Sequence, residues 1–161
     1  MKSRKIALYG LLTALAMILS YVEALIPFSF AVPGIKIGLA NTVTVFALYK
    51  LTPKEALSIS LVRVTLTAVL FGSAYSFMYS LAGALLSFIS MLALKKSGRF
   101  SETGVSVAGG VSHNLGQILV AMAVFDTPGL IYYFPALCVS GTAAGVVIGA
   151  AAGIIAKRVK I

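Results

Sequence analysis

Long hydrophobic stretches follow one another along almost the whole chain and are separated by short polar breaks. The pattern delimits six of them, at residues 5–26, 36–51, 53–72, 75–95, 104–125 and 134–156. A helix needs about 20 mostly apolar residues to cross a bilayer core, and only the second stretch is clearly short of that length. The pattern predicts an all-α membrane protein. Six transmembrane helices would form one compact bundle, as a single domain over residues 1–161.

Local signals support these boundaries. In "TPKE", Thr52 suits the N-cap, Pro53 the first helical position and Glu55 the third, which gives Glu55 a structural role. The segment "PFSFAVPG", residues 27–34, is interpreted as an ordered outer loop. The first stretch follows a basic "MKSRK" but is too long for a signal peptide and has no clean cleavage site after it. It is therefore predicted to be a helix.

Small residues recur at helical spacing in two stretches. In the last stretch, Gly141, Gly145, Gly149 and Gly153 form a ridge that predicts close packing inside the bundle. The first stretch carries a shorter version, made by Ser3, Ala7, Gly10 and Ala14. For this face two interpretations stay open: packing within the bundle, or a groove where the helix of another protein docks.

Composition agrees with a membrane protein and limits the partners. Of the 161 residues, 60% are hydrophobic and 11% are charged, against about 25% charged in a typical soluble domain. The net charge of +9 does not indicate nucleic-acid binding, because the basic residues form short clusters without interleaved aromatic residues. The single cysteine, Cys138, allows neither a disulfide within the chain nor a cysteine metal cluster. Neither a metal nor a cofactor is expected.

The basic residues predict the orientation. Eleven of the thirteen lysines and arginines lie at alternate ends of the stretches: Lys2, Arg4, Lys5, Lys50, Lys54, Lys95, Lys96, Arg99, Lys157, Arg158 and Lys160. By the positive-inside rule this side is cytoplasmic. Both termini are then cytoplasmic, and the protein is predicted to be a multi-pass protein of a bacterial-type plasma membrane.

Polar side chains inside or at the rim of these stretches need a separate explanation: Glu23, Lys36, Asn41, Arg63, His113, Asn114 and Gln117. Arg63 lies about ten residues from either end of its stretch, near the midplane, where a charge costs about 2.5–3.5 kcal/mol. His113 and Gln117 are four residues apart and share a helix face. The depths of these groups predict a substrate pocket open to the outside. An alternative is that they only hydrogen-bond helix to helix.

Catalysis is not indicated by these residues. The lone His113 belongs to no Ser-His-Asp arrangement, and Asp126 and Glu102 fall at helix ends. The single aspartate excludes the paired carboxylates that bind Mg²⁺-diphosphate in chain-elongating prenyl synthases. No phosphate-binding Gly-Lys loop is present, so an ATP-driven step would require a partner. The chain is therefore not expected to be an enzyme by itself.

Several motifs carry a family resemblance over almost the whole chain: "SYVEALIPF", "PGIKIGLANTVTVFALY", the arginine of "VRV", "SLAGALLSFISM" and "GVSVAGGVSHNLGQ". Together they resemble the Gx transporter family, also catalogued as heptaprenyl diphosphate synthase component I. The size and the six-span plan are similar to substrate-specificity components of energy-coupling-factor transporters. This resemblance implies a vitamin-like substrate, a transmembrane coupling protein and ATPase subunits. It also implies a docking role for Ala7, Gly10 and Ala14.

Three functions remain open from the sequence. The first is a substrate-binding transporter subunit, in which Arg63 pairs with an anionic group, His113, Asn114, Gln117 and Asn41 hydrogen-bond the rest, and Glu23 and Lys36 form the rim. The second is a non-catalytic membrane accessory of heptaprenyl diphosphate synthase in menaquinone side-chain synthesis. The third is a purely structural subunit of a membrane complex.

Overall fold

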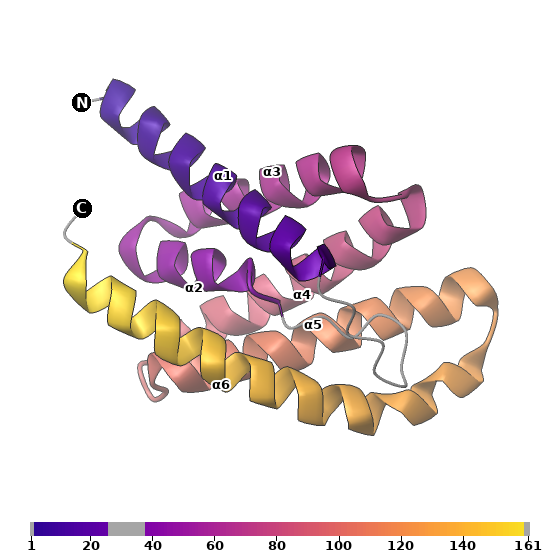
Figure 1. Cartoon of the computed structure of the whole chain (residues 1–161). Helices are drawn as coiled ribbons and strands as arrows, with labels where there is room; N and C mark the ends of the chain where they lie inside the picture. Colours follow the sequence, from indigo (N-terminus) through magenta and orange to yellow (C-terminus); the bar gives the residue numbers. More distant parts are fainter. Residues whose placement is uncertain (1, 26–37, 160–161) are drawn as a thin grey trace.

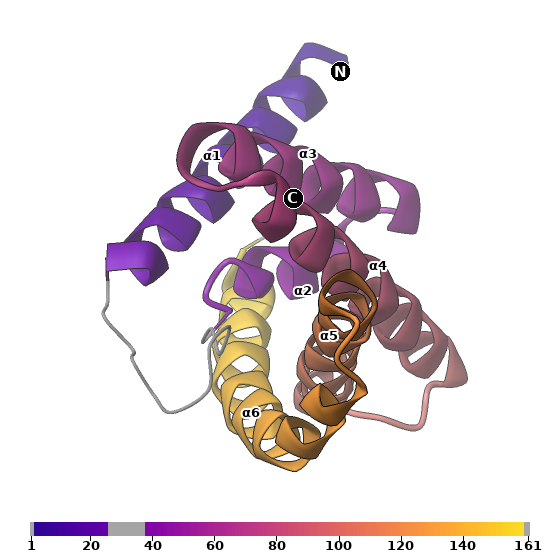
Figure 2. The ribbon, with the colours of Figure 1, turned by 90° about the vertical axis from the view of Figure 1, so that its right-hand side faces the viewer.

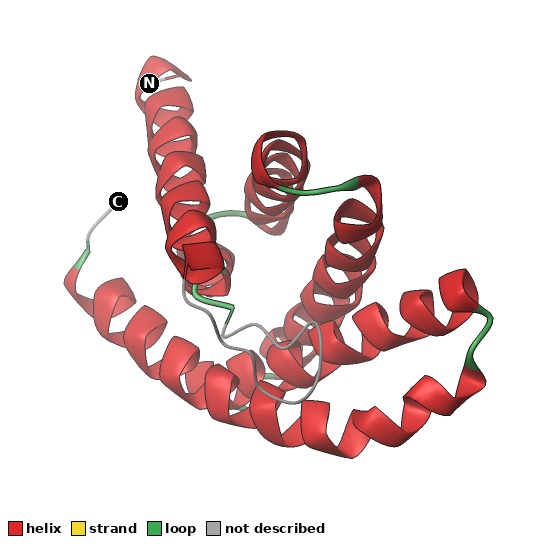
Figure 3. Ribbon diagram, turned by 45° about the vertical axis from the view of Figure 1, so that its right-hand side comes forward, coloured by secondary structure: helices red, strands yellow, loops and turns green. Residues whose placement is uncertain are grey.

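The computed structural model describes residues 2–25 and 38–159, and within them the chain is helical apart from turns (Figure 3). The helices are α1 (Lys2–Leu25), α2 (Asn41–Lys50), α3 (Pro53–Phe71), α4 (Ala74–Ser97), α5 (Glu102–Phe125) and α6 (Phe134–Arg158), with a short 3-10 helix, η1 (Pro128–Tyr133), before α6. These helices correspond to the six predicted stretches. Figure 1 shows them running back and forth, so that α1 begins and α6 ends at the same end of the bundle.

Four helical segments are long and apolar enough to cross a membrane: Ser3–Glu23, Ala74–Ser97, Glu102–Phe125 and Pro128–Arg158. The prediction of six helices is thus confirmed, while the membrane criterion is met by four of them. The helix α3, which carries Arg63, does not meet it. At about 1.5 Å per residue, the 10 residues of α2 reach only half of a bilayer core of about 30 Å.

The short helix α2 lies at the centre of the bundle rather than at its surface. Its residues 43–48 are all buried, and Figure 2 shows α2 between the pair α1 and α3 and the group α4, α5 and α6. A helix that is apolar on every face needs such an enclosure. The helix begins five residues later than predicted because Gly38 adopts a left-handed conformation, with φ 76°, just before it.

Helix α5 is held between α4 and α6 by glycines on both of its faces. A Cβ added to Gly110 would lie 2.4 Å from the carbonyl oxygen of Gly141 on α6. A Cβ added to Gly116 would lie 2.7 Å from the carbonyl oxygen of Ala82 on α4. The predicted glycine ridge on α6 is buried against α5, because a Cβ added to Gly145 would lie 2.5 Å from the Cα of Val107. The structure therefore confirms a packing role for the α6 glycines.

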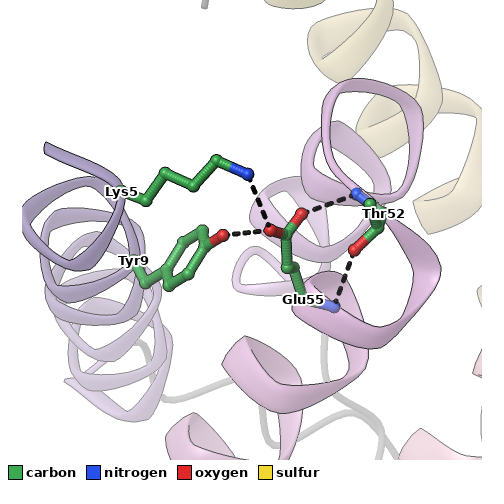
Figure 4. Close-up of polar contacts among 4 residues, drawn as sticks. All are labelled: Lys5, Tyr9, Thr52 and Glu55. Atoms are coloured by element: carbon green, nitrogen blue, oxygen red, sulfur yellow. Dashed lines mark hydrogen bonds and ion pairs between the residues drawn. The ribbon is translucent and has the colours of Figure 1, made fainter. Parts of the chain in front are cut away.

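Helix α1 is joined to α3 through Glu55, close to the start of both helices (Figure 4). Glu55 and Thr52 form the predicted capping box, and the Glu55 carboxylate also accepts a hydrogen bond from the Tyr9 hydroxyl. Lys5 lies 3.5 Å from the same carboxylate, in an exposed ion pair that adds little by itself. This cluster fixes the first turn of α3 relative to α1.

The two ends of the bundle differ in their side chains. The described basic clusters lie where α1, α3 and α5 begin and where α2, α4 and α6 end. Most of the described exposed aromatic residues gather at the opposite end: Tyr21, Phe71, Tyr75, Phe125, Tyr132 and Tyr133, while Phe100 lies at the basic end. Between the ends, large apolar side chains such as Ile89, Val139 and Val147 are exposed. This distribution is that of a membrane protein with an aromatic belt at one interface.

Candidate functional site

A cavity of about 140 Å³ lies among all six helices. Six of the seven predicted substrate-binding residues line it: Glu23, Asn41, Arg63, His113, Asn114 and Gln117. They come from α1, α2, α3 and α5, and the last three share one stretch of α5. Lys36 lies outside the described residues. Residues far apart in the sequence are thus brought to one site.

Arg63 is the cation of this cavity. It lies ten residues after the start of α3 and eight before its end, and so near the middle of that helix. Its Nε and Nη2 atoms are buried and have no hydrogen-bond partner among the described residues. A buried guanidinium normally has such partners. Among the described residues, two nitrogens of this guanidinium therefore lack a hydrogen-bond acceptor.

Glu23 and Gly38 form one rim of the cavity. The Glu23 carboxylate accepts a hydrogen bond from the Gly38 backbone N–H, which ties the end of α1 to the turn before α2. The Gly38 carbonyl then accepts a bond of 2.8 Å from the Asn41 N–H. Since Gly38 has a positive φ, its glycine is required there. This geometry explains "GLAN" in the predicted motif: it delivers Asn41 to the cavity.

Glu23 also balances the charge of the cavity. It carries the opposite formal charge to Arg63 and lines the same cavity. No carboxylate lies within 4 Å of the Arg63 side-chain nitrogens in the part of the chain that the structure describes. Glu23 therefore offsets the formal charge of Arg63 in the cavity but does not form an ion pair with it.

Asn114 has a structural bond as well as a place on the cavity wall. Its side chain is buried, and its Nδ2 atom donates a hydrogen bond of 2.7 Å to the Leu137 carbonyl of α6. This bond lies next to the close contact of α5 and α6 at Gly110 and Gly141. Asn114 thus makes a hydrogen bond between two helices, as expected if the polar residues serve to hold the helices together.

Replacing Asn114 by Ala is expected to destabilise the fold more than it disturbs the cavity chemistry. Loss of the bond to Leu137 should lower the free energy of unfolding by about 0.6–1.7 kcal/mol. Reversible unfolding in mixed micelles measures this change. The matched change, Gln117→Ala, removes an amide for which the described residues show no such bond, and it should leave stability nearly unaltered. Equal losses for the two variants would contradict this difference.

His113 and Gln117 lie one helical turn apart on the cavity wall and are partly buried. The His113 ring sits against α4, in the space left by Gly83: a Cβ there would lie 2.9 Å from the imidazole Nε2. The glycine therefore makes room for the ring. The cavity wall thus carries an imidazole and an amide one helical turn apart.

Hydroxyl groups on three helices are part of the site and were not predicted from the sequence. Ser20, Thr67, Ser76 and Ser80 all line the cavity. The Thr67 Oγ1 atom is buried without a described partner, one turn after Arg63. The sequence signal that could have found Thr67 is its spacing, because it follows Arg63 by four residues and so lies on the same helix face. A serine or threonine in an apolar helix is too common for that signal to stand out.

Ala7, Gly10 and Ala14 lie away from this cavity. All three are exposed on the outer face of α1, together with Ser3. Nothing lies within 4 Å of where a Cβ of Gly10 would be. The opposite face of α1, with Leu12 and Ala16, packs into the core. The small-residue face therefore makes no close packing contact with the described helices.

The motifs that build this site also relate the chain to known proteins. A family model described as heptaprenyl diphosphate synthase component I matches residues 12–155. The chain belongs to this family. The matched range contains every residue that lines the cavity. Comparisons with curated proteins and with solved structures find no match.

Membership of the heptaprenyl diphosphate synthase component I family agrees with two predictions. The family is that of a synthase component I, which is not itself catalytic, so the chain is not an enzyme by itself. Its name implies a partner enzyme component, and so a protein partner. The name does not say what the cavity of a component I protein binds.

Proposed function

We propose that this protein is the substrate-binding membrane subunit of an uptake transporter, of the energy-coupling-factor type, for a vitamin-like small molecule. The observation that carries the proposal is Arg63, a buried cation on the cavity wall whose Nε and Nη2 atoms have no hydrogen-bond partner among the described residues. Burying a charge inside an apolar bundle costs free energy. A protein keeps such a residue when a ligand satisfies it, and a purely structural subunit has no need of it.

The position of the cavity supports entry from the outer side. Gly72, at the turn between α3 and α4, and Glu23, near the end of α1, both line the cavity. These positions lie towards the aromatic end of the bundle, opposite the basic clusters. With the basic side in the cytoplasm, substrate would enter from outside. The polar groups of the wall would then replace its hydration.

The outer face of α1 supports docking on a coupling protein. Small residues allow a second helix to approach closely in a membrane. Ala7, Gly10 and Ala14 present such a surface in the half of α1 nearest the basic side. We propose that a transmembrane coupling protein, joined to ATPase subunits, docks there.

The family name favours a second function. As a non-catalytic component I, the chain would hold a catalytic prenyl synthase at the membrane during synthesis of a menaquinone side chain. Its single aspartate agrees with a division of labour in which the other component binds Mg²⁺-diphosphate. This function does not account for the buried cation on the cavity wall.

The two functions predict different partners. Purification of the protein from its native membranes is expected to recover a transmembrane coupling protein together with ATPase subunits. Gly10→Leu should abolish this recovery, because a large side chain there blocks a close helix approach, while the protein itself stays folded. A matched change that adds bulk at an exposed small residue of α6, Ala143→Leu, should have no effect. Recovery of a prenyl synthase, with no ATPase, would replace the proposed function by the accessory one.

A further inference from the structure

The cavity limits the chemistry of its ligand through its size and its charges. Its volume of about 140 Å³ is close to that of an apolar cavity of about 150 Å³ that holds one benzene ring in another protein. A heptaprenyl chain is several times larger than this cavity, and a three-ring flavin exceeds it as well. The part of a ligand that the cavity surrounds is therefore about one ring in size, with its polar substituents.

The charges on the wall favour a single negative charge. Arg63 and Glu23 are the oppositely charged residues among the described lining residues, and their formal charges cancel. A monoanion beside Arg63 is favourable, because it provides the missing acceptor. A phosphate or diphosphate group would bring more negative charge, close to Glu23, than one guanidinium can offset.

The Arg63 atoms without a described partner favour an acceptor with two oxygens. Nε and Nη2 are two neighbouring donors of the guanidinium, which presents its N–H groups in a fixed fork. A carboxylate or a phosphate matches this fork with two parallel hydrogen bonds, and of the two the single negative charge favours the carboxylate. Thr67 adds a hydroxyl one turn further along α3, and its oxygen also lacks a described partner. Arg63 and Thr67 thus form an anion-binding pair on one wall.

On these grounds we infer that the cavity binds a small monocarboxylate of about one ring in size, with its carboxylate on Arg63 and Thr67. Gln117 and Asn41 then face the rest of the molecule and select its polar substituents. This inference rests on the proposed binding function and narrows it to one substrate class. A phosphorylated prenyl compound would match this class neither in charge nor in size.

The test uses a small-molecule extract of the cells as the probe, with the purified full-length protein in lipid nanodiscs. The extract should raise the midpoint temperature of unfolding. It should lose this effect after its carboxylates are converted to methyl esters, and keep it after phosphatase treatment. Mass spectrometry of the molecules retained by the protein should then identify a one-ring monocarboxylate. Stabilisation that survives esterification, or that phosphatase abolishes, overturns the inferred class and leaves the binding function standing.

Variants complete the test. Arg63→Gln should weaken binding of the retained compound about 10- to 100-fold, as expected for the loss of charge-assisted hydrogen bonds. Arg63→Lys should restore part of the affinity, and Thr67→Val should lower it while keeping the size of the side chain. The exposed Arg99→Gln is the matched control and should bind normally. If no extract stabilises a folded parent protein, both the inferred class and the proposed binding function fail.

Discussion

Replacing Arg63 by Leu is expected to make the protein more stable and unable to bind its substrate. Two guanidinium nitrogens of Arg63 are buried without a described partner, so the substitution removes no known hydrogen bond from them. It also removes the cost of a charge inside the bundle, and should raise the free energy of unfolding by up to about 3 kcal/mol. Reversible unfolding in mixed micelles measures this gain. Mass spectrometry of released small molecules measures the loss of ligand.

This combination separates a binding residue from one that holds helices together. A structural arginine would destabilise the fold when it is removed, as Asn114 should, because its partners would be left without hydrogen bonds. The control is Arg99→Leu, which makes the same change at an exposed position and should alter neither quantity. A marked loss of stability in Arg63→Leu, with ligand content unchanged, would show that Arg63 serves the fold and not the cavity.

The second large effect is expected at the contact between α5 and α6. Gly145→Leu should destabilise the fold by at least about 2 kcal/mol, because the first added atom would already lie 2.5 Å from the Cα of Val107. Backbone cannot yield as a flexible side chain does, so the two helices must separate. Since both helices line the cavity, ligand binding should be lost as well. The yield of folded protein and its unfolding in mixed micelles measure the effect.

Gly10→Leu is the matched control for this prediction. It makes the same change on α1, where nothing lies within 4 Å of the position that a Cβ would take. Stability should therefore not fall, although partner recovery should. If Gly145→Leu folds and unfolds like the parent, the α6 glycines are not required for packing. The contrast between the two positions follows from what lies opposite each glycine, and not from the glycine spacing.

Local regularities in the sequence predicted most of the helices. Hydrophobic length, the Thr52 capping box and the prolines near helix starts are properties of neighbouring residues, and they placed the boundaries of α3 to α6 within two residues. The predicted start of α2, at residue 36, was wrong by five residues. It depends on the conformation of Gly38, and that turn is held by a bond to Glu23 from another helix. A window along the chain contains no such contact.

The sequence by itself determined that this is an apolar helical chain with one buried cation, small-residue faces and basic clusters on one side. Polar residues in apolar stretches cannot all face lipid, so their gathering was predictable. Only the tertiary structure decided that six of these polar residues line one cavity, and that Thr67 lines it too. It also decided that the Asn114 side chain donates a hydrogen bond to the Leu137 carbonyl, and that the two small-residue faces differ: the one on α6 is packed and the one on α1 is open. The reason is physical: burial and hydrogen bonding depend on what lies across the helix interface, and each helix meets partners that are distant along the chain.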